Sequence, residues 1–268
     1  MAAPTIERDP SWTERTVSVC GRPVHVSVAG NGPAIVVFPR DQGHAPMTPE
    51  FIRQLAATNT IYFPWLAGFH GGEPSEWDWM TSVRDLAIVH HRMLDALGLE
   101  RPALIGLGFG GWLAAEIATM SPRSLRALVL VSPMGMKPHE AYIYDQFLVS
   151  TERYAQTALR DKALFEQVYG SETTFEQLEA WETDREMTSR IAWKPYMYNP
   201  VLAELLSGIE IPTLIVHGED DQIVPAECAQ RYKGAIAGSR LELLPESGHA
   251  VEFDQPDALT RAIATFLA

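Results

Sequence analysis

The chain has 268 residues, of which 46% are hydrophobic and 21% charged, and its formal net charge is -13. This length and apolar content allow one large core, while the excess of acid argues against a nucleic-acid or anionic-membrane surface, which needs clustered Lys and Arg. The two cysteines, Cys20 and Cys228, lie outside any metal-type cluster, so we expect a reducing compartment and no metal site.

Residues 1–14 are polar and contain proline, which does not match the apolar core of a secretory signal. No apolar stretch approaches the roughly 20 residues that a membrane span requires. We therefore expect a cytoplasmic protein that acts on a small molecule. We expect no membrane or nucleic-acid partner, and the oligomeric state is left open.

Strand-like and helix-like segments alternate along most of the chain. Two alternating segments flank Gly21-Arg22-Pro23 and predict an antiparallel hairpin, and continuous apolar runs predict strands buried on both faces. The predicted strands are 16–20, 24–28, 34–38, 60–63, 103–106, 127–131, 213–217 and 241–244. The predicted helices are 49–57, 77–97, 109–120, one starting at 225 and one starting at 255. This order implies an α/β fold with a mostly parallel sheet covered by helices.

One region breaks the alternation, because residues 138 to 206 are helix-like and show no strand-like run. We predict a helical cap, residues 137–206, inserted after the strand that ends near Val131. The core domain would then comprise residues 1–136 and 207–268. Open α/β sheets bind ligands at the carboxyl ends of their strands, so a cap there would enclose a dry, aromatic-lined pocket.

The segment after the predicted strand 103–106 is crowded with glycine and reads Gly106-Leu107-Gly108-Phe109-Gly110-Gly111. A strand, a tight turn and a helix are the layout of a nucleophile elbow, G-x-S-x-G, in which a strained turn exposes a serine hydroxyl. Small residues flank such a turn because the two backbones approach closely. Gly108 stands where that serine is expected, so we predict a vacant nucleophile position.

Two later stretches complete a recognisable set, residues 216–225 (VHGEDDQIVP) and residues 245–252 (PESGHAVE). With the elbow, in this order, they resemble the acid loop and the histidine loop of the α/β-hydrolase fold family. The resemblance extends over essentially the whole chain and implies that Asp221 is the triad acid and His249 the general base. Asp220 is a weaker candidate for the acid, one residue out of register. The alternative is a packed loop histidine, with Asp221 capping the helix that starts at Pro225.

The chain departs from the family at the oxyanion hole. Family members carry His-Gly after the first parallel strand, whereas Pro39 and Arg40 occupy those positions here. Proline has no N–H, so we expect the backbone amides of Asp41 and Phe109 to serve as donors, with Arg40 contributing charge. The alternative for Arg40 is an exposed loop residue in a surface ion pair.

Aromatic residues concentrate in the predicted cap, and we expect a pocket for a flat or hydrophobic molecule. Packing of the cap on the sheet is the simpler interpretation for any one of these residues. The predicted pocket residues are Leu107, Met134, Trp193, Tyr196 and Val251. Ser132, Cys228 and Ser247 are possible replacement nucleophiles, but strand-end serines usually cap turns and a lone cysteine is usually core. We therefore predict none.

Three functions are compatible with this sequence. The first is a cofactor-independent enzyme in which His249, oriented by Asp221, takes a proton from substrate or from water in the space left at Gly108. Proton abstraction beside a carbonyl, C–C cleavage, cyclisation or oxygen chemistry without a cofactor would all fit. The second is a serine esterase whose nucleophile was replaced by glycine. The third is a non-catalytic protein that binds a small ligand under its cap.

Overall fold

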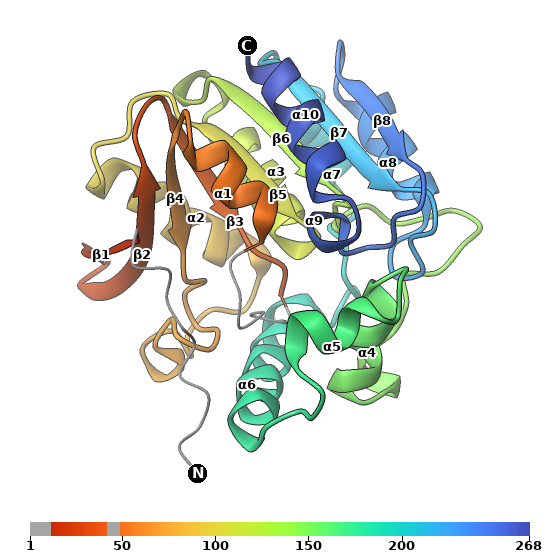
Figure 1. Ribbon diagram of the computed structural model, residues 1–268. Coiled ribbons are helices and arrows are strands. Elements are labelled where there is room, and N and C mark those ends of the chain that lie inside the picture. Colours follow the sequence, from red (N-terminus) through yellow and green to blue (C-terminus); the bar gives the residue numbers. More distant parts are fainter. Residues whose placement is uncertain (1–11, 42–48) are drawn as a thin grey trace.

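The computed structural model describes residues 12–41 and 49–268 (Figure 1). The polar N-terminal residues 1–14, which do not match a secretory signal, therefore lie mostly outside the described residues. The described strands form one sheet with the order β1-β2-β4-β3-β5-β6-β7-β8. Their bounds are β1 Thr13–Val19, β2 Arg22–Gly30, β3 Ala34–Phe38, β4 Thr60–Pro64, β5 Ala103–Leu107, β6 Ala127–Val131, β7 Thr213–Gly218 and β8 Arg240–Leu244.

The sheet confirms the predicted fold class. β1, β2 and β4 pair antiparallel, and every pair from β4 through β3, β5, β6 and β7 to β8 is parallel. All residues of β5, β6 and β7 are buried. Strands covered on both faces have no polar face to present, which is why their sequences are continuous apolar runs.

Helices cover both faces of the sheet (Figure 1). The core helices are α1 Glu50–Ala56, α2 Val83–Ala96, α3 Phe109–Met120, α8 Ala226–Ala235, α9 Val251–Asp254 and α10 Pro256–Leu267. On β3, Val36 and Phe38 face one buried cluster with α2, α3 and α8, whereas Ile35 and Val37 face a second cluster with α1 and α10. The alternation follows from the two-residue period of a strand.

The predicted helix 77–97 is shorter in the structure than in the sequence analysis. α2 begins at Val83, because the Ser82 hydroxyl accepts a hydrogen bond from the Asp85 amide while the Asp85 carboxylate accepts one from Ser82. This reciprocal capping satisfies two amides at the helix start and fixes the boundary. Residues before it form turns and the short helix η1, Pro74–Glu76.

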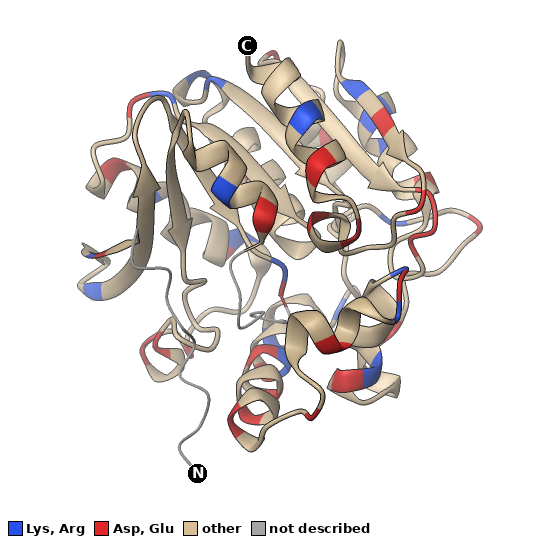
Figure 2. Ribbon diagram, in the orientation of Figure 1, with Lys and Arg blue, Asp and Glu red and all other residues tan. Residues whose placement is uncertain are grey.

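The described elements of residues 137–206 are helical, as predicted: η3 Gln146–Leu148, α4 Thr151–Ala158, α5 Leu164–Tyr169, α6 Phe175–Ala192 and α7 Leu202–Leu206. Figure 1 shows α4, α5 and α6 gathered below the sheet, beyond the ends of its strands, and α7 packs against α3 and α8 of the core. Acidic and basic residues are interspersed on α6 and α10 (Figure 2). Across the described chain, no helix has the length and apolar character needed to cross a membrane.

A neutral histidine lies inside the core under β3. His90 on α2 is fully buried, its Nε2 accepts a hydrogen bond from the Ala67 amide at 3.2 Å, and its ring lies edge-on to Phe38 at 5.5 Å. Burial disfavours the charged imidazolium and lowers the pKa of His90 from 6.5 to about 3.

This shift predicts a specific loss of stability in mild acid. Below pH 6.5 the unfolded chain binds a proton at His90, while the folded chain stays neutral until about pH 3, so falling pH favours unfolding. Between pH 7 and pH 5 this group alone removes about 2 kcal/mol from the free energy of unfolding. In urea titrations, His90→Gln should show a correspondingly smaller loss over that range. Equal losses in the two proteins would contradict a neutral, buried His90.

Candidate active site

The turn between β5 and α3 is the tightest place in the site. A Cβ on Gly106 would lie 2.2 Å from the Gly110 carbonyl oxygen, and a Cβ on Gly110 would lie 2.4 Å from that of Phe38. Gly108 itself has φ 53° and ψ -112°, a conformation that strains any residue with a side chain. The predicted strand, turn and helix are therefore present, with Gly108 at the turn.

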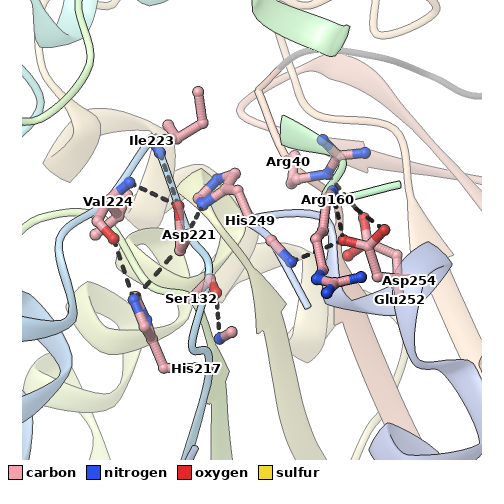
Figure 3. A network of polar contacts seen from close by, with 12 residues as sticks. Arg40, Ser132, Arg160, His217, Asp221, Ile223, Val224, His249, Glu252 and Asp254 are labelled. Atoms are coloured by element: carbon pink, nitrogen blue, oxygen red, sulfur yellow. Dashed lines mark hydrogen bonds and ion pairs between the residues drawn. The ribbon is translucent and has the colours of Figure 1, made fainter. Parts of the chain in front are cut away.

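Two loops bring an acid and a histidine together (Figure 3). Asp221 follows β7 and His249 follows β8, and the His249 Nδ1 lies 2.9 Å from the Asp221 Oδ2. Both side chains are about 1% exposed. An ionised carboxylate can only accept, so Nδ1 carries the hydrogen and Nε2 keeps its lone pair.

Asp221 also stabilises its own loop through hydrogen bonds to backbone amides. Its Oδ1 accepts hydrogen bonds from the amides of Ile223 at 2.8 Å and Val224 at 2.9 Å, just before α8. Burial favours the neutral acid, but His249 and these amides more than offset it and lower the pKa of Asp221 below its ordinary value. The capping alternative is therefore compatible with the histidine pairing. Asp220 is half-exposed and pairs with Arg160 at 2.7 Å, away from that pairing.

A second histidine lies beneath the acid. His217 on β7 is fully buried, and its Nε2 lies 3.1 Å from the Val224 carbonyl oxygen and 3.6 Å from the Asp221 Oδ2 (Figure 3). Burial lowers the pKa of His217, so this ring is neutral. The neutral ring donates from Nε2 and supports the loop without competing for the charge of Asp221.

His249 fills part of the space that a side chain at position 108 would occupy. A Cβ built on Gly108 would lie 2.8 Å from the His249 Nε2 and 3.0 Å from the Arg40 Cγ. The Nε2 atom is buried and finds no hydrogen-bond partner among the described residues. A buried basic nitrogen without a partner is therefore directed at Gly108, where it can receive a proton from a bound molecule.

Arg40 is a buried residue, not the exposed loop residue that the alternative interpretation predicted. Its Nε donates to the Glu252 Oε1 at 2.7 Å, and its Nη2 donates to the Tyr169 hydroxyl at 3.4 Å. Burial opposes the charge, but Glu252 and Tyr169 more than offset it and raise the pKa of Arg40. Because Glu252 neutralises the guanidinium, little free charge remains for an oxyanion.

Asp41 has a buried carboxyl group in addition to the backbone amide that we predicted as an oxyanion donor. Its side chain is buried, and its Oδ2 accepts a hydrogen bond from the Gln146 Nε2 at 3.0 Å. Burial raises the pKa of Asp41, although Gln146 and His249 lower it in part. Gln146 on η3 and Tyr154 on α4 were not predicted from the sequence, because single polar groups on short helices give no periodic signal.

Phe109, Met134 and Tyr196 lie in packed positions. Phe109 packs between Phe69 and Trp112, with ring centroids 5.7 and 5.8 Å away, at the start of α3. Met134 is fully buried, and the half-buried Tyr196 donates through its hydroxyl to the Tyr144 carbonyl oxygen at 2.9 Å.

Three of the pocket predictions need correction. Trp193 is 53% exposed, because its ring lies against Phe147 on the outer side of the segment. Leu107 and Val251 are buried within the core cluster of α1 and α10, so both side chains fill the core. Aromatic content alone does not reveal which face of a helix is covered.

The possible replacement nucleophiles lie in structural positions. Ser132 is fully buried, and its hydroxyl lies 3.5 Å from the Gly218 amide. Cys228 donates through Sγ to the Met136 carbonyl oxygen at 3.3 Å, and burial raises the pKa of its thiol to about 12. Ser247 is fully buried in the loop before His249. None of the three has the exposed, acidified setting of an activated nucleophile.

Residues 21–262 match the sequence model of the alpha/beta hydrolase family. The chain belongs to the α/β hydrolase family. This α/β hydrolase is 26% identical to a 2-hydroxy-6-oxo-2,4-heptadienoate hydrolase of Pseudomonas putida, over 92% of this chain and 90% of the relative. It is also 26% identical to the serine hydrolase BPHL of Mus musculus, over 95% of this chain and 86% of the relative.

Solved structures show the same fold. A meta-cleavage product hydrolase of Pseudomonas fluorescens superposes on this α/β hydrolase with a TM-score of 0.75 and 20% identity. The superposition covers 94% of this chain and 96% of that one. At this identity the likeness concerns the fold, and the chemistry has to be argued from the residues present here.

The geometry of Gly108 in this α/β hydrolase predicts a large cost for any side chain there. Gly108→Ala should lower the free energy of unfolding by about 1–3 kcal/mol, since the backbone is left-handed and the new Cβ would contact His249 and Arg40. Urea denaturation measures this. Gly234→Ala is the matched control, because Gly234 is helical with nothing within 4 Å of its Cβ position. We expect it to be stabilising by about 0.5–1 kcal/mol. Equal effects at the two positions would contradict the crowding at Gly108.

Proposed function

We propose that this α/β hydrolase acts on a small, largely apolar or aromatic carbonyl compound, using the His249–Asp221 pair as general base and no serine nucleophile. The single observation that carries the proposal is the position of the His249 Nε2, buried, unpartnered and 2.8 Å from the Cβ position of Gly108. The reaction is water-mediated hydrolysis or a proton abstraction that leads to C–C cleavage or cyclisation.

The pair has the parts that proton transfer requires. Asp221 accepts the Nδ1 hydrogen of His249 at 2.9 Å, which fixes the tautomer and stabilises the imidazolium that forms when Nε2 takes a proton. Two backbone amides hold Asp221 in place. A histidine with this orientation accelerates proton transfer by typically 100- to 10,000-fold.

The remaining roles follow from the positions around Gly108. We assign the oxyanion site to the amides of Phe109, at the start of α3, and Asp41, after β3, with Arg40 held nearby by Glu252. Helix starts carry unpaired amides and favour negative charge. Residues 137–206 serve as the cap, since Gln146 from this segment reaches Asp41 and places polar and aromatic groups over the site.

The relatives suggest where to look for the substrate. One of them is named for 2-hydroxy-6-oxo-2,4-heptadienoate, a molecule with an enol hydroxyl conjugated to a ketone. Such a compound offers an acidic proton and a carbonyl oxygen on one planar framework. A base without a nucleophile can isomerise it by proton transfer, so we include it in the substrate panel.

The crowding at Gly108 supports this proposal over a disabled serine esterase. A serine Cβ would contact the His249 Nε2 and the Arg40 Cγ at 3.0 Å or less, so the present positions of both side chains would have to change. The altered residues Pro39 and Arg40 add to this argument. A non-catalytic binder has no need of the buried, hydrogen-bonded His249–Asp221 pair.

The test compares the unaltered chain, His249→Ala and Gly108→Ser on nitrophenyl esters and a panel of carbonyl compounds that includes the dienoate. We expect the unaltered chain to convert a carbonyl compound, and His249→Ala to be at least about 100-fold slower. His139→Ala is the control, because His139 is exposed in the segment before η3. Gly108→Ser should remain a poor esterase.

Two results would contradict the proposal. A Gly108→Ser variant with vigorous esterase activity would favour the disabled esterase. Absence of turnover across the panel, combined with tight binding of one of its members, would favour the non-catalytic binder.

A further inference from the structure

A second acid–base group lies next to the His249 site and has no role in the base mechanism. Asp41 is 2% exposed, although it is an aspartate on a loop. It directly follows Arg40, whose Cγ touches the space at Gly108, and it is close enough to His249 for the imidazolium charge to lower its pKa. Asp41 and His249 therefore border the same space from two different loops.

The groups around Asp41 leave hydrogen-bonding capacity unused. Gln146 donates to the Asp41 Oδ2 through Nε2, but its Oε1 is buried without a partner among the described residues. The Tyr154 hydroxyl on α4 is equally buried and unpartnered within the described chain, and burial raises its pKa, so it remains a neutral donor. Together with the His249 Nε2, these are three buried polar atoms without a partner in the described chain, and all three belong to residues that interact with Asp41. Such a set is expected where a polar ligand binds.

The charged and titratable groups near Asp41 come from several of the described elements. The basic groups Arg40 and His249 lower the pKa of Asp41, whereas a nearby acidic group favours its protonated form. Asp184 on α6 is a second buried acid near Asp41, and burial raises its pKa well above the ordinary value. Arg40 acts in the opposite sense, but Glu252 neutralises it. The titratable groups that face Asp41 are Arg40, Tyr154, Asp184, Tyr196 and His249.

We propose that the Asp41 carboxylic acid is a second catalytic residue, a general acid that works opposite the His249–Asp221 base on an enolic or enolisable carbonyl substrate. The assignment rests on the proposed function above and adds the proton donor that a base alone lacks. When the environments of two titratable groups separate their pKa values, one group can donate a proton while the other accepts one in the same site.

The step balances on the conjugated dienoate. His249 Nε2 takes the proton of the enol hydroxyl, and the electron pair moves along the conjugated chain. A carbon of that chain takes the proton from Asp41 and forms the keto isomer. The site is left with an imidazolium and a carboxylate. The imidazolium proton then returns to Asp41 through solvent, which restores both groups.

A purely structural role for Asp41 is the competing explanation, since its bond to Gln146 ties the loop after β3 to η3. Asp41→Asn separates the two roles. The asparagine carbonyl oxygen still accepts from the Gln146 Nε2, but the amide cannot donate a proton in the reaction. Glu140→Gln is the matched control, because it removes one carboxyl group from an exposed position in residues 137–206, the segment that contains Gln146.

The experiment follows deuterium uptake into carbon of 2-hydroxy-6-oxo-2,4-heptadienoate in heavy water, at a series of pH values. We expect Asp41→Asn to lower kcat by at least about 100-fold with little change in KM. It should also remove the alkaline limb of the pH profile, while His249→Ala should remove the acidic limb. Glu140→Gln should match the unaltered chain. The infrared difference spectrum between the unaltered chain and Asp41→Asn at neutral pH should contain a protonated-carboxyl band of Asp41, since any band of the buried Asp184 is common to both proteins and cancels.

The outcomes separate this inference from the function on which it rests. Full activity and an unchanged pH profile in Asp41→Asn, with an inactive His249→Ala, would overturn the role of Asp41 and leave the His249 base standing. A rise in KM with kcat unchanged would assign Asp41 to binding or structure. No conversion of the dienoate by the unaltered chain would overturn both proposals for this substrate class.

Discussion

The close approach of three backbones at the end of β5 governs the arrangement of the whole site. Cβ atoms on Gly106 and Gly110 would lie 2.2 to 2.4 Å from carbonyl oxygens of Gly110 and Phe38, so β3, β5 and α3 meet where no side chain fits. The residues that follow β3 are therefore delivered directly to Gly108. This is how Arg40 and Asp41, distant in sequence, come to border the elbow.

Two buried polar pairs lie near that meeting point. The Asp221 carboxylate accepts a hydrogen bond from the neutral His249 ring, and the Arg40 guanidinium pairs with the Glu252 carboxylate (Figure 3). An unpaired charge at this depth would cost several kcal/mol, so each pair depends on its own partner. His249 and Glu252 stand three residues apart at the start of α9. One short segment after β8 thus positions both pairs relative to Gly108.

The sequence predicted the strands well because burial on both faces leaves only apolar residues, as β5 and β6 show. The start of α2 was misplaced by six residues, since the cap formed by Ser82 and Asp85 outweighs the apolar period before it. The proximity of His249 and Asp221 followed from motif order.

Other parts of the site were outside the reach of sequence patterns. The pairing of Arg40 with Glu252 joins residues 212 positions apart, which no local pattern can predict. The Asp41 carboxyl was overlooked because only its amide belongs to the oxyanion motif. Trp193 was assigned to the pocket on its residue type, but the side of the segment on which it lies is set by packing with Phe147. These features depend on tertiary contacts that local preference does not determine.

Arg40 and a side chain at position 108 compete for one small space. The effect of replacing either residue therefore depends on which residue occupies the other position, which is epistasis with a steric origin. A serine introduced at position 108 would contact the Arg40 side chain that already occupies the space. Removal of Arg40 would leave the buried Glu252 carboxylate without its ion-pair partner. Each of these single changes is therefore expected to lower the stability of the chain. The two loops are thus constrained to change together.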